Sequence, residues 1–165
     1  MVVSAIFMVL VLLPLLGFTI TNAYQKHMIG SIKNELIAYS YSILAVAEVA
    51  DQQLQMPDFL LENQFNVDQS GLYAAFTPQQ NNQKLLWQSS SLLTVDMALY
   101  QQNPALGGAY FSQIEDNQSS YFVYSISVSF TSNNQPFDTT LHIIKTNDPF
   151  QLLMAAVFIT SILYL

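Results

Sequence analysis

Side chains suited to acid–base or metal chemistry are few in this chain and lie far apart in the sequence. It has two histidines, 11 acidic residues and no cysteine among 165 residues. Either histidine can titrate near neutral pH. However, His27 sits at the edge of an apolar segment and His142 lies between Leu141 and Ile143, which favours surface or hydrogen-bonded histidines over ligands. The lack of cysteine excludes disulfides, thiol nucleophiles and cysteine-based zinc sites.

The carboxylates come in pairs rather than in clusters. Glu115 and Asp116 are adjacent in an expected turn, and Asp58 and Glu62 are four residues apart. A divalent cation needs several oxygens that converge on one point, which neither pair supplies alone. A solvated acidic surface is therefore the simpler interpretation, with cation binding as the alternative. No nucleophile elbow, phosphate-binding glycine loop or zincin motif occurs in the sequence, so no residue indicates catalysis.

The composition excludes nucleic acid as a partner. The net charge is -7, and four lysines are the only permanently basic residues. Neutralising a phosphate backbone requires a basic patch, which this balance does not provide. Only 9% of the residues are charged, against about 25% in ordinary soluble domains. The deficit lies at the two ends of the chain.

Residues 1–25 carry no charged side chain and predict a transmembrane helix. About 20 apolar residues suffice to cross a bilayer, and the proline and glycine in this run are tolerated in membrane helices. A cleaved signal peptide is the main alternative, but there is no basic region before the apolar run and only a weak cleavage-like triplet, Thr21-Asn22-Ala23. A buried soluble helix is the remaining alternative.

Residues 149–165 are predicted to begin a second transmembrane helix. The run Leu152–Leu165 is uncharged but too short to span a bilayer by itself, so we expect the chain to be a fragment of a longer protein. A core strand or a short core helix is the alternative. Residues 26–148 then form one domain outside the membrane, since a long segment translocates largely regardless of its charge.

A long helix over Thr21–Gln55 is expected to follow the first apolar run. Its apolar residues are spaced by three and four, as in a heptad seam. The members of this seam are Ile29, Ile32, Leu36, Tyr39, Ile43, Val46 and Ala50. The seam predicts either the dimer helix of a homodimer or packing on the domain's own sheet, and the sequence does not decide between them.

The rest of the domain is predicted to form strands separated by turn-forming residues. In Tyr121–Thr131 apolar residues alternate with serines, which predicts a half-buried antiparallel strand. A short helix is expected over Ser91–Gln102. The other expected strands are Gly71–Thr77, Lys84–Gln88, Ala109–Ile114 and Phe137–Thr146. Helices on a sheet built of hairpins predict an α+β fold.

Four segments resemble the periplasmic sensor region of PhoQ-type two-component sensor histidine kinases. They are SGLYAAF, KLLWQSSSL, IEDNQSSYFVYSISVSF and LHIIKTNDPFQLLM, and with the order of elements the resemblance covers nearly the whole chain. It implies a PAS/PDC-like antiparallel sheet with a long N-terminal helix, flanked by transmembrane helices. The last strand would lead back into the membrane.

The resemblance implies a homodimeric receptor of the bacterial inner membrane whose domain faces the periplasm. Such receptors respond to divalent cations, antimicrobial peptides or acidity. They control a cytoplasmic kinase that autophosphorylates a histidine from ATP and passes the phosphoryl group to a response regulator. The kinase part, with its ATP, would lie beyond Leu165, and this chain would carry only the signal input.

The chain departs from the family at the cation site. The best-known members carry a long acidic run between the third and fourth strands, whereas this chain has Glu115 and Asp116 followed by Asn117, Gln118 and two serines. Glu115 and Asp116 are the nearest equivalents for binding Mg²⁺ or Ca²⁺. Two other functions stay open: the input domain of a chemoreceptor or cyclase, and a pilin-like subunit. Against the pilin, the apolar helix has no glutamate and a second apolar segment is present.

Overall fold

The computed structural model describes residues 2–80, 84–92, 103–115 and 119–147. Its contacts divide the chain into residues 1–35 and residues 36–165. One helix, α1 (Val2–Leu44), contributes to both units. The side chains of most residues before Leu15 are not described. Among the residues whose side chains are described, no helix is long and apolar enough to cross a membrane.

The helix α1 ends at Leu44, so the prediction of a helix as far as Gln55 is wrong. The last turn tightens, with the Val46 N–H donating to the Ile43 carbonyl over 3.2 Å. The chain then forms an antiparallel hairpin of β1 (Glu48–Ala50) and β2 (Gln53–Gln55). Its turn places two non-glycine residues at positive φ, as a two-residue hairpin turn of type I′ requires.

Contacts with a distant hairpin hold the β1–β2 turn. The side-chain amide of Gln52 donates to the Ser132 carbonyl over 3.1 Å, and that of Asn133 donates to Asp51 Oδ1 over 3.2 Å. These partners lie about 80 residues away in the sequence. Such contacts override the helical spacing of the local sequence.

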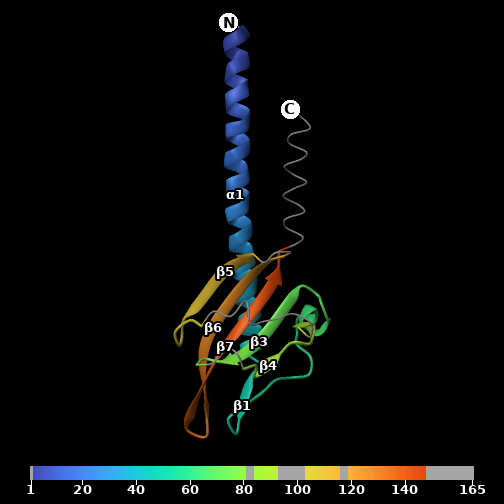
Figure 1. Cartoon of the computed structure of the whole chain (residues 1–165), viewed down its shortest axis with the longest axis vertical. Helices are drawn as coiled ribbons and strands as arrows, with labels where there is room; N and C mark the ends of the chain where they lie inside the picture. The colour runs from blue at the N-terminus through green and yellow to red at the C-terminus, as the bar shows by residue number, and fades with distance from the viewer. Residues whose placement is uncertain (1, 81–83, 93–102, 116–118, 148–165) are drawn as a thin grey trace. The chain divides into compact units, whose positions relative to one another are not determined.

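The main sheet has five strands in the order β4-β3-β7-β6-β5, all pairs antiparallel, which confirms the α+β expectation. Figure 1 shows these strands side by side, with β7 in the middle. The bounds are β3 Leu72–Pro78, β4 Trp87–Gln88, β5 Ala109–Glu115, β6 Ser120–Ser132 and β7 Gln135–Thr146. The five predicted strands are thus present, although β4 is shorter than expected. Of the expected helix over Ser91–Gln102, only its start is described, as the 3₁₀ turn η2 (Ser90–Leu92).

The two faces of the sheet are covered by different elements. One face carries Tyr124, whose pKa is raised by burial and by the nearby Tyr41 hydroxyl of α1, so this face lies toward the helix. The opposite face forms a core with Leu92 of η2. The strand residues in that core are Tyr73, Ala75, Val123 and Ile144.

Strand β6 has the expected alternation but not the expected exposure. Its serines were expected on a solvent-facing side, because polar residues on alternate positions are typical of a half-buried strand. Instead Ser125 and Ser127 are fully buried. The centre of the sheet is therefore covered on both faces, and polar side chains lie inside one of them.

A second 3₁₀ turn, η1 (Asn63–Asn66), anchors the loop that follows the hairpin. Its Phe65 is buried and meets the ring of Tyr39 edge to face, with centroids 5.6 Å apart. The Asn66 side chain makes hydrogen bonds to both backbone groups of Leu60. Its Oδ1 accepts from the Leu60 N–H and its Nδ2 donates to the Leu60 carbonyl, each over 2.9 Å. The loop is thereby fixed to the domain.

Replacing Phe65 by alanine is expected to lower the free energy of unfolding by about 3–5 kcal/mol, because it leaves a cavity beside Tyr39. The matched control is Phe59→Ala in the same loop, where the ring is 79% exposed, and its effect should stay within about 0.5 kcal/mol. Denaturant unfolding of the two variants makes the comparison. Equal losses would contradict the described packing of this loop.

Candidate functional site

A buried polar network lies in the middle of the sheet, on the face that η2 covers. It consists of Thr77, Ser125, Ser127, Thr140 and His142, each with no exposed surface. The strand register places them together, because Thr77 pairs with Thr140, Thr140 pairs with Ser127, and His142 pairs with Ser125. Paired residues of antiparallel strands share a face of the sheet.

His142 is hydrogen-bonded through both ring nitrogens. Its Nδ1 lies 2.8 Å from Ser125 Oγ, and its Nε2 lies 3.0 Å from Thr77 Oγ1. A neutral imidazole donates from one nitrogen and accepts at the other, and a hydroxyl can serve as either partner. The sequence favoured a surface or a hydrogen-bonded histidine, and of these two the structure shows the hydrogen-bonded one.

The remaining two hydroxyls form a directed chain. Ser127 Oγ donates to the Pro104 carbonyl over 2.8 Å, so its lone pair accepts from Thr140 Oγ1, also at 2.8 Å. Pro104 lies in the segment that covers this face. The network thus connects strands β3, β6 and β7 to the chain segment at Pro104.

This arrangement does not fit nucleophilic catalysis. An activated serine needs a base that a third group orients, and access to a substrate. Here both imidazole nitrogens face hydroxyls, and neither Ser125 nor Thr77 has exposed surface. What the network can do is respond to protonation, because its histidine is buried without a carboxylate among its hydrogen-bond partners.

Burial lowers the pKa of His142 to about 4. The cause is desolvation, since a charged imidazolium is disfavoured where water is excluded. The two hydroxyl partners could both accept from an imidazolium, so burial rather than lost hydrogen bonds sets the direction. In the unfolded chain the pKa returns to about 6.5.

Next to the network, the end of β7 is tied to the start of β6. The Asn147 N–H donates to the Ser120 carbonyl over 2.7 Å, and its side-chain Nδ2 donates to Ser120 Oγ over 3.1 Å. Asn147 is the last described residue before the C-terminal apolar run and is itself buried. The described end of the chain is therefore held to the sheet as far as Asn147.

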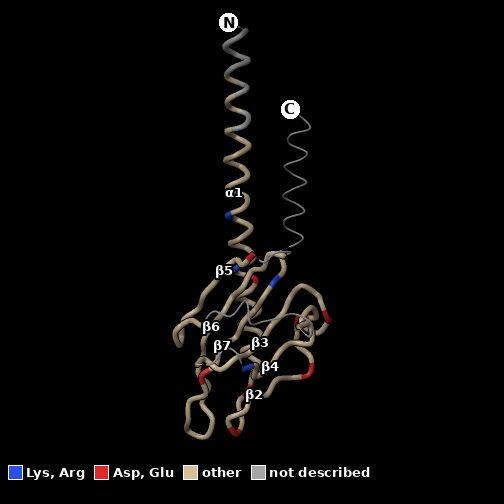
Figure 2. The backbone as a smooth tube through the Cα atoms, in the orientation of Figure 1, with Lys and Arg blue, Asp and Glu red and all other residues tan. Residues whose placement is uncertain are grey.

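The acidic pair expected to bind cations is described only in part. Glu115 is exposed at the end of β5, whereas Asp116 lies outside the described residues. Figure 2 shows the acidic positions of the domain scattered over the tube. In the described part of the chain, no three histidine, cysteine, aspartate or glutamate side chains come together as a metal site would require. Mg²⁺ or Ca²⁺ binding stays a prediction.

The residues of the expected dimer seam fall into three groups. Leu36 and Ile43 are buried in the domain's own core, while Ile29, Ile32 and Tyr39 are half-buried on α1. Val46 and Ala50 are not on the helix, because α1 ends before them and Ala50 belongs to β1. A helical seam through all seven residues is therefore wrong in its last two members. Dimer formation stays a prediction.

The polar network was not recognised in the sequence. Its signal was present: serines on one side of Tyr121–Thr131 and a histidine among the apolar residues of the next strand. Only the register brings Ser125 opposite His142, and the Pro104 carbonyl that Ser127 meets comes from another part of the chain.

No family model, curated protein or solved structure matches this chain.

The free energy of unfolding is expected to fall as the pH is lowered from 7.5 to 5. Because the unfolded histidine takes up a proton near pH 6.5 and the folded one only near pH 4, the unfolded state binds more protons in this window. The stabilisation that comes from neutral His142 in the folded state is fully present above pH 6.5. It is lost progressively as the pH falls through 4. The loss by pH 5 amounts to roughly 2 kcal/mol.

The His142→Gln variant should lose this part of the pH dependence, although its stability at pH 7.5 will also change. His27→Gln, at an exposed position of α1, is the control and should retain the wild-type slope. Denaturant unfolding at several pH values measures the slope of the unfolding free energy against pH for each variant. An identical slope in His142→Gln and the wild-type chain would contradict the assignment.

Proposed function

We propose that this chain is the signal-input region of a membrane-bound sensor, with residues 26–148 outside the cytoplasm. The observation that carries the proposal is the way in which the two uncharged ends join the domain. One uninterrupted helix, α1, contains the first apolar run and also Leu36 and Ile43 of the core. At the other end, the central strand β7 is followed by buried Asn147, the last described residue before the second run in the sequence.

Ordered residues next to both apolar runs in the sequence suit a sensor. A flexible linker would absorb any displacement of the domain, whereas a core helix and a central strand move only if the core rearranges. An input that favours one of two arrangements by about 1–3 kcal/mol is enough to bias a switch several-fold. The sequence supports the membrane anchors, since residues 1–25 lack charged side chains.

We propose further that the sensor is of the PhoQ type, with a PAS/PDC-like domain in the periplasm of a bacterial inner membrane. The support is the resemblance of the four segments described above and the long helix followed by an antiparallel sheet. On this proposal the chain works as a homodimer in the lipid bilayer. A histidine kinase that uses ATP and a response regulator would receive its signal.

The absence of cysteine makes a direct test of location possible. Phe59→Cys places a single thiol at a side-chain position that is 79% exposed, so it should react with a membrane-impermeant maleimide in intact bacterial cells. The chain should also remain in the membrane fraction after alkaline carbonate extraction. The parent chain without cysteine controls for background.

The outcome that would contradict the proposal is labelling of the Phe59→Cys variant only after cell lysis. That result would place the domain in the cytoplasm. Release of the chain by carbonate would show that it has no membrane anchor, and the proposal depends on that anchor.

A further inference from the structure

A pocket of about 310 Å³ lies between the loop after β2 and the edge strand β4. Its apolar wall includes Met56, Phe65 and Trp87, and its polar groups include Asp58, Gln88 and Ser90. The volume is at the lower end of small-molecule sites, which run from roughly 300 to 1,000 Å³. The pocket is separate from the His142 network, because Trp87 and Phe76 point to the opposite face of the sheet from Thr77.

The walls of the pocket are held in place by the domain. Phe65 is buried against Tyr39, and Asn66, another lining residue, clamps the backbone of Leu60 through two hydrogen bonds of 2.9 Å. On the strand side, Trp87 meets Phe76 with ring centroids 6.1 Å apart. These contacts hold the Trp87 ring in place before any ligand enters, with buried Phe65 supporting the opposite side of the pocket.

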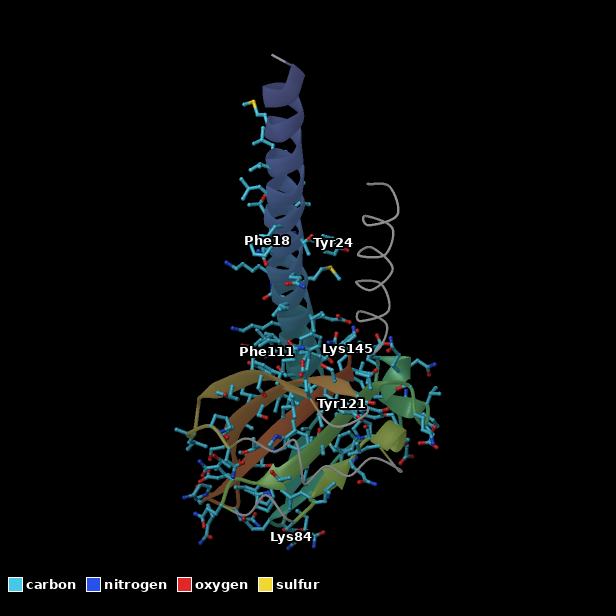
Figure 3. The ribbon with its side chains drawn as sticks, turned by 45° about the horizontal axis from the view of Figure 1, so that its top comes forward. Phe18, Tyr24, Lys84, Phe111, Tyr121 and Lys145 are labelled. Atoms are coloured by element: carbon cyan, nitrogen blue, oxygen red, sulfur yellow. The ribbon has the colours of Figure 1, made fainter. Side chains whose placement is uncertain are left out.

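The charge of the pocket selects the ligand class. Among the described residues that line it, Asp58 is the one ionisable group, and none of the four lysines lines it. Figure 3 shows Lys84 and Lys145 at different ends of the domain. The whole chain carries a net charge of -7, which raises the local concentration of cations. An aromatic wall beside a carboxylate is the combination that binds organic cations, through the ring face and the opposite charge.

We propose that this pocket binds a small organic cation, such as a quaternary or primary amine with a short apolar body. The apolar part would lie against Trp87, and the cationic group near Asp58. Gln88 and Ser90 offer acceptors for a hydroxyl or ammonium hydrogen. The inference goes beyond the proposed function, because the pocket can bind such a cation whether or not the domain signals across a membrane.

Trp87 is the one tryptophan of the chain, so its fluorescence reports on the pocket directly. The probe is choline, titrated into the purified full chain in a non-ionic detergent at low salt. The control ligand is 3,3-dimethylbutan-1-ol, which has the shape of choline without the charge. Choline should give a saturable change in fluorescence, and the neutral alcohol should bind at least about ten-fold more weakly.

Two matched variants test the carboxylate. Asp58→Asn should weaken choline binding about five-fold or more at low salt, with a smaller effect at about 0.15 M salt because an exposed charge is screened. Asp68→Asn removes another exposed carboxylate that does not line the pocket and should leave binding unchanged. Both positions are exposed, so circular dichroism should show that both variants fold.

Three results would overturn the proposal. The first is no saturable response to choline, and the second is equal binding of the neutral alcohol. The third is an equal loss in the two aspartate variants, which would indicate attraction by the overall charge rather than by the pocket. Because binding is measured on the purified chain, a failure here leaves the labelling experiment on cellular location unaffected.

Discussion

The burial of the central strand on both faces is the constraint on which the rest of this domain depends. Strand β7 lies between β3 and β6, and residues Thr139 to Ile144 are buried without interruption. In such a position water cannot satisfy a polar side chain, and an unpaired hydroxyl or imidazole costs on the order of 1–3 kcal/mol. The polar residues of β7 therefore require partners on the neighbouring strands.

The partners come from strands far apart in the sequence. Thr77 of β3 and Ser125 of β6 hold the two nitrogens of His142, while Ser127 accepts from Thr140 and donates to Pro104. The strand register must be correct for these bonds to form, since a slip of one residue would turn every side chain to the other face. The network thus specifies the pairing of three strands. It also makes the domain sensitive to protonation of one histidine.

Much of the sheet could be predicted from the sequence. The alternation in Tyr121–Thr131 and the turn residues around it are local signals, and β6 and β7 lie within a few residues of the expected ranges. The β1–β2 hairpin could not be predicted, because its turn depends on Gln52 meeting Ser132 about 80 residues later. Apolar spacing in the same segment indicated a helix and misplaced Val46 and Ala50.

The candidate sites show the same division between local and distant signals. His142 was recognisable as a buried or surface histidine, but not as the centre of a network, because its partners come from two other strands. The pocket at Trp87 combines a loop and an edge strand that have no common sequence pattern. Glu115 and Asp116 were recognised as a local pair, and among the described residues Glu115 belongs to no group of three side chains that could hold a metal ion.

The central claim is that the end of β7 belongs to the cooperative core, so that a displacement in the domain reaches the segment that follows. Amide hydrogen exchange of the full chain tests it most directly, by comparing Asn147, whose N–H is bonded to the Ser120 carbonyl at 2.7 Å, with buried Ile143. We expect both amides to exchange with the same opening free energy, because one unfolding event exposes them. Exchange of Asn147 orders of magnitude faster than Ile143 would show a frayed strand end and contradict the coupling.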